Sequence, residues 1–435
     1  MTLCTLFMLA ACDNLRSPAG TAQVSLSVKA SLAIKVPVEV RRQAGALGFA
    51  PVIIRLNMGV DLAPLNSSRR AAAIETVASR VIARVSPDQV RIVHRYQIVP
   101  ILSAWANDDG LAALAELPDV AEVVLDRLEQ PSLDRSTRLI NAHLVWPAST
   151  GTGRLVAVLD TGTDGLHPFV STRVPYEACF RKDSKCPGLV PQKTGSGAAR
   201  NMARGHGMHV AGIAAGGNAS WGGVQLRGVA PGAGIIAINV FTPGGSYVGD
   251  QVKALEYVAQ LKQANVRVVA ANLSLGDGVT YQSACDQAEK DRKPIIDKLL
   301  AMGVATVVAA GNRALPDAVS APGCITSAVT VSSVTNLDRI NAANSRSALT
   351  DYMAPGEAIM SSLPHGVYGD QSGTSMAAPH VSGAIALLSA AVPQATLPQI
   401  LAALSKTGKP LYEQSTNRTY HRIDVRAALV HLQGQ

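Results

Sequence analysis

A serine stands at the start of an apolar, small-residue stretch near the C-terminal end of the chain. The run Gly-Thr-Ser-Met-Ala-Ala-Pro-His at 373–380 leads directly into the apolar segment 381–388. This pattern predicts a turn followed by a buried helix, with Ser375 in the first turn of that helix. Free backbone NH groups at a helix N-terminus can stabilise an oxyanion, so Ser375 is a candidate nucleophile. The alternative is a serine that only caps the helix.

A nucleophilic serine needs a base, and the base needs a carboxylate that orients it. The apolar run 155–159, typical of a strand buried on both faces, ends in Asp160. Open α/β sheets build their sites at the carboxyl ends of strands, which is where this carboxylate is expected. His206 begins a second helix of small residues and is the candidate base. His206 and His209 could instead bind a metal, but no HExxH spacing or acidic cluster completes a ligand set, so no metal is expected.

The remaining apolar runs predict the elements that position these residues. Further buried strands are expected at 235–240, 266–273 and 304–309, with helices at 249–262 and 294–302 between them. This alternation predicts an α/β class domain with a doubly wound parallel sheet. A dinucleotide site is not expected, because no strand leads into a GxGxxG turn.

Composition and charge narrow the class of protein. The chain has 435 residues, of which 47% are hydrophobic, enough for a large core and more than one domain. The formal charge of +8 is not gathered into blocks, which indicates weak surface attraction and no nucleic-acid partner. No uninterrupted apolar run reaches the length that spans a membrane.

The N-terminal region predicts export. Residues 1–12 are short and apolar and end in Leu-Ala-Ala-Cys, which resembles the lipobox of bacterial lipoproteins and predicts a lipid on Cys12. The alternative is a chance match, since no Lys or Arg precedes the apolar run. Residues 13–50 are expected to form a tether between this segment and the folded chain.

The other cysteines form two pairs that suit disulfides in an oxidising compartment. We expect Cys179 to pair with Cys186 and Cys285 to pair with Cys324. The alternative is four buried free thiols, which would fit a cytosolic protein.

Residues 51–130 predict a small domain of their own, with elements in the order β-α-β-β-α-β. That order is the ferredoxin-like α+β pattern. A small domain of this type before a hydrolase suggests a propeptide, and the alternative is an ordinary accessory domain. Its boundary is expected within 127–137, with cleavage after Leu128 or Leu133, because proline directly after a scissile bond is disfavoured.

Several motifs together resemble the subtilisin-like serine proteases. They are Asp-Thr-Gly at 160–162, His-Gly-Met-His at 206–209, Ala-Gly-Asn at 310–312 and Gly-Thr-Ser-Met-Ala-Ala-Pro at 373–379. The likeness runs from about residue 135 to the end, and the preceding unit resembles that family's inhibitor-type propeptide. The chain order Asp, His, Ser also excludes an α/β-hydrolase, whose order is Ser, acid, His and whose elbow needs a glycine where Ala377 stands.

The resemblance implies a role for each matching residue. Ser375 would attack the peptide carbonyl, His206 would move the proton and Asp160 would orient His206. Asn312 would donate to the oxyanion together with the backbone NH of Ser375. The alternative for Asn312 is a turn residue that follows a strand.

The resemblance also implies how substrate binds. Ser274, Leu275 and Gly276 match the segment that pairs with extended substrate. Arg313 is expected at the rim of the pocket for the residue before the cut, where its charge would favour acidic and disfavour basic residues; the alternative is a solvated arginine on a loop. Phe169 stands where some members place a calcium-binding aspartate, so no calcium is expected there.

Taken together, these features predict an exported serine endopeptidase, made as a self-processing zymogen, in the periplasm, at the cell envelope or secreted. It would act on proteins or peptides without a cofactor, be inhibited by its own propeptide, and be anchored to a membrane if Cys12 carries lipid. Two alternatives remain. One is a catalytically silent peptide-binding module at the cell envelope, and the other is a cytosolic, unprocessed peptidase.

Overall fold

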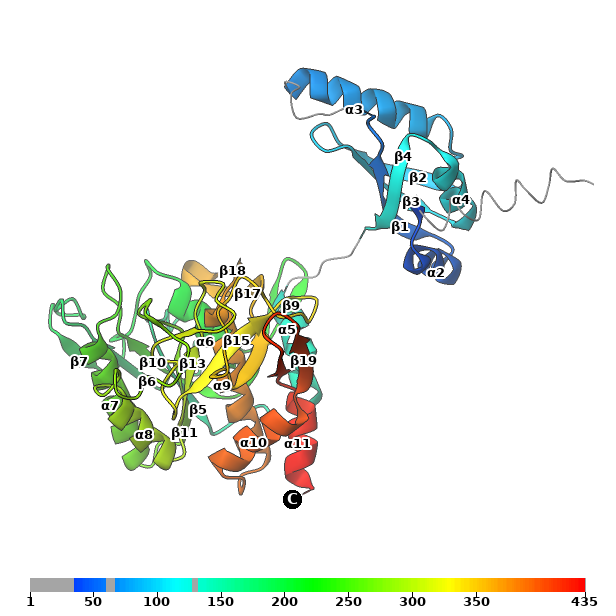
Figure 1. Ribbon diagram of the computed structural model, residues 1–435. Helices are drawn as coiled ribbons and strands as arrows, with labels where there is room; N and C mark the ends of the chain where they lie inside the picture. Colours follow the sequence, from blue (N-terminus) through cyan, green and yellow to red (C-terminus); the bar gives the residue numbers. More distant parts are fainter. Residues whose placement is uncertain (1–34, 60–66, 127–131, 435) are drawn as a thin grey trace, which may run out of the picture. The chain divides into compact units, whose positions relative to one another are not determined.

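The computed structural model describes residues 35–59, 67–126 and 132–434. The chain divides into two compact units, Met1–Glu129 and Gln130–Gln435 (Figure 1). The expected lipid site at Cys12, most of the expected tether and the expected cleavage site at Leu128 lie outside the described residues. In the part of the chain that is described, no helix is long and apolar enough to cross a membrane.

The first unit is an antiparallel sheet covered by helices. The sheet has the order β2-β3-β1-β4. Its elements are β1 (Ala50–Leu56), α3 (Ser67–Ile82), β2 (Val90–Arg95), β3 (Ile101–Ala106), α4 (Asp108–Glu116) and β4 (Val120–Leu125). This is the β-α-β-β-α-β order expected for a ferredoxin-like unit, with β1 between β3 and β4 and antiparallel to both.

A helix in the first unit corrects the expected tether. Residues Val38–Leu47 form α2, which begins after Pro37 and belongs to the core of this unit. Val40 and Ala44 are buried there, at the four-residue spacing of one helix face, and Val36, just before the helix, is buried as well. Proline is well tolerated at the start of a helix, so the tether prediction is wrong for residues 38–47.

The second unit is built on a 10-stranded sheet with the order β19-β20-β16-β15-β13-β11-β5-β10-β6-β7. The strands from β20 to β6 pair in parallel, and the two edge strands β19 and β7 pair antiparallel to their neighbours. The strands are β5 (Leu155–Asp160), β6 (Tyr176–Phe180), β7 (Gln192–Thr194), β10 (Gly234–Asn239), β11 (Val268–Leu273), β13 (Ala305–Ala309), β15 (Val329–Val334), β16 (Tyr352–Pro355), β19 (Lys409–Glu413) and β20 (Arg418–Arg422). The predicted strands therefore lie within a few residues of the observed ones.

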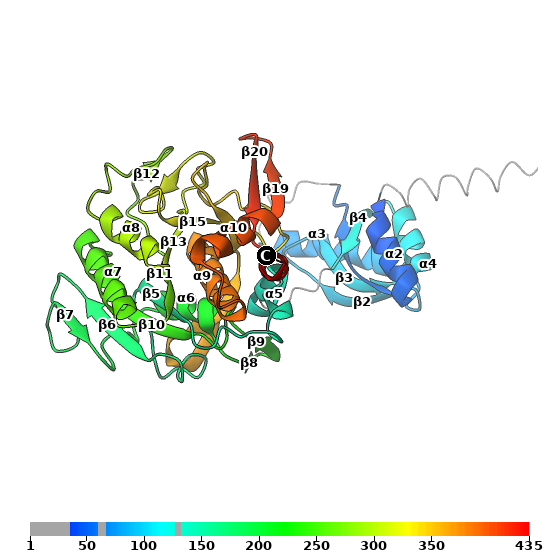
Figure 2. The same cartoon turned by 90° about the horizontal axis from the view of Figure 1, so that it is seen from below.

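Helices cover both faces of this sheet, and Figure 2 shows the central strands between the two layers. They are α5 (Ser132–Leu139), α6 (His206–Ala215), α7 (Val248–Gln263), α8 (Lys293–Ala301), α9 (Thr374–Ala391), α10 (Leu397–Thr407) and α11 (Val425–Gln433). Val156 and Val158 of β5 pack into the core with α6 and α9, whereas Ala157 and Leu159 face the core with α7 and α8. This alternation confirms the expected doubly wound α/β arrangement, since a strand buried on both faces is apolar throughout.

Short elements complete the unit around the central sheet. They are the 3-10 turns η1 (Ala142–Leu144) and η2 (Pro364–Gly366), and the strands β8 (Ala219–Trp221), β9 (Val224–Leu226), β12 (Thr280–Tyr281), β14 (Val319–Ser320), β17 (Ile359–Leu363) and β18 (Val367–Gln371). The hairpin of β17 and β18 ends just before the start of α9. It therefore leads the chain directly to Ser375.

Candidate active site

Asp160 and His206 form a buried pair at the carboxyl end of β5. Asp160 is the last residue of β5 and has no solvent exposure, whereas the His206 side chain is 32% exposed. Nδ1 of His206 lies 2.8 Å from Oδ1 of Asp160. The backbone NH of Thr161 donates to the same carboxylate oxygen at 2.6 Å. Because Nδ1 faces a carboxylate, the ring is held with its proton on Nδ1 and Nε2 free to act as a base.

Two opposing effects set the pKa of His206. Burial alone would lower the pKa, because it disfavours the charged imidazolium, but the negative charge of Asp160 and its hydrogen bond outweigh burial. The net result is a pKa raised above the ordinary histidine value of 6.5. A base whose pKa lies near the working pH is well matched to moving protons in a reaction.

Gly207 lets α6 start close against β5. A Cβ atom at Gly207 would lie 2.4 Å from the carbonyl oxygen of Gly162 and 3.1 Å from Cβ of Asp160. The backbone NH of Gly207 also donates to Oγ1 of Thr161 at 2.9 Å. The Asp-Thr-Gly and His-Gly motifs therefore place the base against the carboxylate by direct contact of two backbones.

Ser375 lies in the first turn of α9, as its sequence context predicted. Helix α9 begins at Thr374, and Gly373 is its N-cap. The hydroxyl of Ser375 donates to the carbonyl oxygen of Ser274 at 3.4 Å, and no hydrogen bond joins it to His206 among the described residues. Hydrogen bonds between catalytic groups are often long in free enzymes and tighten when substrate binds.

Asn312 is oriented by the start of the same helix. Its Oδ1 accepts hydrogen bonds from the backbone NH of Thr374 at 2.9 Å and from Oγ1 of Thr374 at 3.0 Å. These bonds commit the oxygen, so the amide Nδ2 remains as a donor. A Cβ atom at Gly373 would lie 3.0 Å from that Nδ2, which shows how closely the amide approaches this turn.

A cavity of about 230 Å³ brings most of the other predicted site residues together. Its wall includes Leu275, Gly276, Gly278, Asn312, Arg313 and Ser375. Ser274 lies beside it and bonds to Ser375. A Cβ atom at Gly278 would lie 2.9 Å from Nη2 of Arg313, so the guanidinium rests on the loop that follows the predicted substrate segment. Asp160 and His206 are not part of this wall and lie at the end of β5 and the start of α6.

Comparison with known proteins assigns the family. The sequence model of the subtilase family matches residues 151–425, which is more than half of the chain. The chain belongs to the subtilase family. It is accordingly a serine endopeptidase.

Individual relatives agree with this assignment. The chain is similar to Subtilisin E of Bacillus subtilis (strain 168), with 30% identity over 329 residues that cover 73% of this chain and 77% of the relative. It is also similar to an intracellular serine protease of Paenibacillus polymyxa, with 32% identity over 61% of this chain and 76% of that protein. A solved structure of a protease from Pseudoalteromonas arctica PAMC 21717 shares the fold, with a TM-score of 0.57 and 23% identity over 70% of this chain and 98% of that one.

The start of α9 in this subtilase is tied to β11 by buried polar residues that sequence reasoning missed. Oγ of Ser274 donates to the carbonyl oxygen of Ser375 at 2.7 Å and accepts from Nδ2 of Asn272 at 2.9 Å. Oγ of Ser382, about two turns beyond Ser375 on α9, donates to Oδ1 of Asn272 at 2.9 Å. Asn272 and Ser382 have no solvent exposure. An asparagine inside an apolar strand was the available signal, since buried polar groups need partners.

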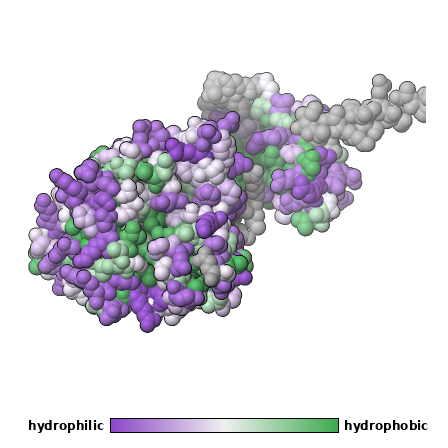
Figure 3. Space-filling model, turned by 60° about the horizontal axis from the view of Figure 1, so that its bottom comes forward, coloured by the Kyte–Doolittle hydropathy of each residue, from purple (hydrophilic) through white to green (hydrophobic). Residues whose placement is uncertain are grey.

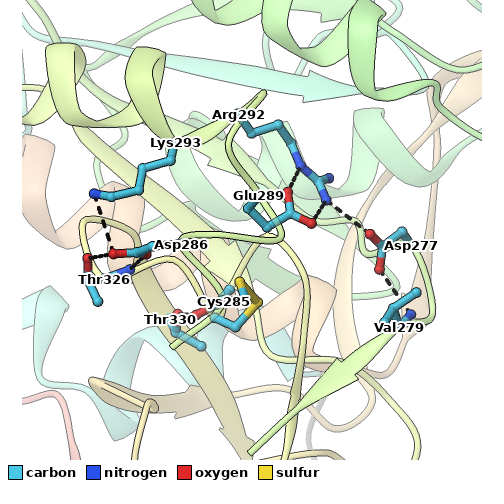
Figure 4. Close-up of a disulfide and its surroundings, with 11 residues drawn as sticks. Asp277, Val279, Cys285, Asp286, Glu289, Arg292, Lys293, Thr326 and Thr330 are labelled. Carbon is cyan, nitrogen blue, oxygen red and sulfur yellow. Dashed lines mark hydrogen bonds and ion pairs between the residues drawn. A yellow bond between two sulfur atoms is a disulfide. The ribbon is translucent and has the colours of Figure 1, made fainter. Parts of the chain in front are cut away.

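The loop after Gly276, the end of the expected substrate segment, is held by a buried cation (Figure 4). Arg292 is 1% exposed; its Nη2 donates to Asp277 at 3.0 Å and to Glu289 at 2.7 Å, and its Nη1 donates to Gln251 at 3.0 Å. Asp277 directly follows Gly276 and also accepts from the backbone NH of Val279 at 3.0 Å. The sequence offered no periodic signal for this network, because its members come from separate elements.

Both expected disulfides are present. Cys285 is joined to Cys324 beside this network, and Cys179 of β6 is joined to Cys186 in the loop between β6 and β7. The first bridge links the segment after Gly278 to the loop that follows the oxyanion region.

His209 of the subtilase does not face His206. Its Nε2 donates to the carbonyl oxygen of Gly369 at 3.0 Å, and burial lowers its pKa to about 3. Its ring is therefore neutral and directed to β18. In the part of the chain that the structure describes, no group of His, Cys, Asp and Glu side chains has the arrangement of a metal site.

Proposed function

We propose that this subtilase is an exported endopeptidase that processes its own zymogen through Asp160, His206 and Ser375. The observation that carries the proposal is the Asp160–His206 pair, whose Oδ1 and Nδ1 lie 2.8 Å apart at the carboxyl end of β5. The neighbouring parallel strand β11 leads at the same end of the sheet to Ser274, which bonds to Ser375. A carboxylate, an imidazole and a serine in these roles are the parts that acyl transfer through an ester requires.

In the first half of the reaction, Oγ of Ser375 attacks the carbonyl carbon of the scissile peptide. Its proton moves to Nε2 of His206, and Asp160 stabilises the imidazolium that forms. The tetrahedral intermediate then collapses, and His206 returns the proton to the leaving amine. An acyl ester on Ser375 remains. Water then attacks the carbonyl carbon of this ester while His206 takes a proton from the water, and His206 returns that proton to Oγ of Ser375 as the ester bond breaks.

Asn312 and the backbone NH of Ser375 would stabilise the negative charge on the carbonyl oxygen. The Nδ2 group of Asn312 is directed by the two bonds that its Oδ1 accepts from Thr374. The NH of Ser375 lies at the N-terminus of α9, an 18-residue helix whose dipole favours negative charge. Donors fixed in this way lower the barrier without having to reorganise.

Substrate would bind in extended form along Ser274, Leu275 and Gly276. Backbone pairing of this kind tolerates many sequences, and side-chain pockets add the preference. The cavity of about 230 Å³ between this segment, Asn312 and Arg313 is the pocket proposed for the residue before the cut.

The first unit would act as the propeptide that covers the site until it is removed. Support comes from its separate core and its ferredoxin-like order of elements. Export is supported by the disulfides, which suit an oxidising compartment, and by the apolar N-terminal run. Residue Cys12 is the proposed point of a lipid anchor.

The test compares the wild-type chain with Ser375→Ala, both expressed with export. We expect wild type to begin within residues 127–137 and to be labelled on Ser375 by a fluorophosphonate, a reagent for activated serines. Ser375→Ala should stay full length and unlabelled. The exposed Ser372→Ala serves as the matched control and should behave as wild type.

Two other outcomes would each overturn part of the proposal. Wild type that stays full length but is labelled would be an unprocessed peptidase. Wild type that is neither processed nor labelled, although its disulfides have formed, would be a silent peptide-binding module.

A further inference from the structure

A second cavity lies at the amino ends of the central strands, whereas the candidate active site lies at their carboxyl ends. Its volume is about 400 Å³, within the range of small-molecule sites. Arg154 and Arg267 stand immediately before β5 and β11, which are parallel, so both lie at the amino ends of these strands. Asp160 ends β5 and Ser274 directly follows β11, so both lie at the carboxyl ends of these strands. The cavity is therefore separate from the peptidase site.

Positive side chains gather in this cavity without an acidic partner. Its wall contains Arg154, Lys262 and Arg267 and has no aspartate or glutamate. None of these cations takes part in an ion pair within the described part of the chain. Like charges held together repel one another, and burial makes the repulsion stronger.

The ionisation of two of these groups reflects this repulsion. Burial, and then the charge of Arg267, lower the pKa of Arg154. Burial, and then the charge of Arg154, lower the pKa of Lys262. The arrangement is thus unfavourable for the empty protein and would be relieved by a bound anion.

The cations keep hydrogen-bond donors for such a ligand. Nε and Nη2 of Arg154 each donate to Ser389, at 3.0 Å to its hydroxyl and 3.0 Å to its carbonyl oxygen, which fixes the guanidinium on α9. Lys262 uses one proton on the carbonyl oxygen of Val268 at 3.1 Å and has two others. Arg267 is exposed and makes no side-chain bond in the described part of the chain, so its whole fork remains.

Apolar side chains form the rest of the wall. Val269, Ile385, Leu397 and Ile400 are each no more than 8% exposed. Figure 3 brings forward the lower side of Figure 1 and shows hydrophobic side chains on that face of the second unit, surrounded by hydrophilic ones. Apolar walls next to cations strengthen the attraction of an anion and give room for an apolar group attached to it.

We propose that this cavity binds a tetrahedral oxyanion of the phosphate type, held by Arg154, Lys262 and Arg267. Planar, forked guanidinium groups suit phosphate oxygens, and a lysine adds a compact charge. Inorganic phosphate and the phosphate end of a monoester share this chemistry. Ser389 lies 14 residues after Ser375 on α9, about 21 Å along the helix, so the ligand would act on stability rather than on the reacting groups.

The experiment follows thermal unfolding of the full chain in the Ser375→Ala background, which prevents self-digestion during heating. Phosphate replaces chloride at constant ionic strength, and the melting temperature is measured against phosphate concentration. We expect a saturable rise of about 2 °C or more, as for a ligand that binds only the folded state. Phenyl phosphate is the second arm, and a half-saturating concentration below that of phosphate is expected because the apolar wall adds contact.

Arg267→Gln is the test variant because its side chain has no other role in the described structure. Arg418→Gln, an exposed arginine on β20, is the control with the same change of charge. Arg267→Gln should lose at least half of the rise, and Arg418→Gln should keep it. An equal rise in both variants would show that phosphate acts on the whole surface, and no rise in either would show that the cavity does not bind it; both results overturn the proposal.

Discussion

His206 shows how a single residue combines burial with a strong partner. Burial favours its neutral form and Asp160 favours its charged form, with the balance toward the charged form. In the proposed mechanism, only the neutral ring can accept the proton of Ser375. Activity is therefore expected to be absent when His206 is protonated and to appear as the pH rises through its pKa.

The first prediction concerns this pH dependence. We expect kcat/KM of the processed enzyme to rise with pH, with a midpoint above 6.5, because the folded pKa of His206 is raised. Asp160→Asn removes the charge that raises the pKa, so its midpoint should move down. Its rate should fall by about 10⁴-fold, the magnitude that this substitution has in serine proteases with the same arrangement. A midpoint that does not move in Asp160→Asn would contradict the assignment of the base.

Gly373 is the second residue for which we make a prediction, because the amide of Asn312 lies too close to leave room for a side chain. Its φ is +142° and a Cβ atom would meet Nδ2 of Asn312 at 3.0 Å. Gly373→Ala should displace the amide and lower kcat by about 10² to 10³-fold, the loss known for removal of an oxyanion donor. Gly366→Ala is the control, since Gly366 also has a positive φ, of +76°, but nothing within 4 Å. Equal losses in both variants would point to backbone strain instead of the amide.

Arg313 is expected to set preference without touching the reacting atoms. Its guanidinium rests against Gly278 at the wall of the cavity proposed for the residue before the cut. We expect wild type to cleave after acidic residues in preference to basic ones, and Arg313→Gln to lose this discrimination by about tenfold. A peptide library measures it, with the exposed Arg339→Gln as control. A wild-type preference for lysine or arginine would refute the role.

At the scale of elements, the substrate segment is held from both ends. Ser274 bonds to Ser375 of α9, and Asp277 bonds to the buried Arg292 (Figure 4). The bond from Oγ of Ser274 ends on the backbone carbonyl oxygen of Ser375 and the bond to Asp277 ends on its side chain, so neither uses the Ser375 hydroxyl. Their proposed role is to keep Leu275 and Gly276 in the extended form that substrate pairs with.

The fourth prediction tests this role. Asp277→Ala should raise KM by about three- to tenfold and leave kcat within about twofold, because it loosens a binding segment and leaves the catalytic groups in place. Arg292 keeps Glu289 as a partner in this variant, so no buried charge is left unpaired. Glu256→Ala, which removes an exposed carboxylate on α7, should change neither constant. A fall in kcat with unchanged KM would contradict a positioning role in binding.

At the scale of the whole molecule, helix α5 at the start of the second unit limits where the proposed processing could occur. Helix α5 starts at Ser132 and carries Ser136 and Thr137 into the core of the second unit. Nε2 of His380, on α9, lies 2.8 Å from Oγ of Ser136. A cut after Leu133 would require this helix to unwind, because proteases bind substrate as an extended strand.

The fifth prediction follows from that constraint. Of the two expected cleavage points, we predict the one after Leu128, so that the mature enzyme begins at Glu129. N-terminal sequencing of the processed wild type measures it. Leu128→Asp should shift or slow the cut and Leu133→Asp should leave it in place. A mature chain that begins at Asp134 would show that α5 opens during processing.

Short-range sequence patterns predicted much of the fold of this protein. Apolar runs of strand length and the small-residue helices predicted the α/β class, and the position of Asp160 at a strand end predicted its place in the sheet. These signals are local: burial on both faces makes a strand apolar throughout, and close packing of a helix N-terminus requires small residues. The tether expected over residues 13–50 missed helix α2 at Val38–Leu47, because only two of its residues, Val40 and Ala44, are buried and so short an apolar face gives a weak periodic signal.

What the tertiary structure decided are the contacts between residues that are far apart in sequence. Such contacts join separate elements. They include the bond between Ser274 and Ser375 and the bond from Arg292 to Asp277. Another is the cluster of Arg154, Lys262 and Arg267 at the amino ends of the strands. No periodicity encodes such pairs, because each depends on how strands and helices meet after folding. The residue types of the candidate site were thus determined by the sequence, and its supporting contacts and the second cavity only by the packing of the sheet with its helices.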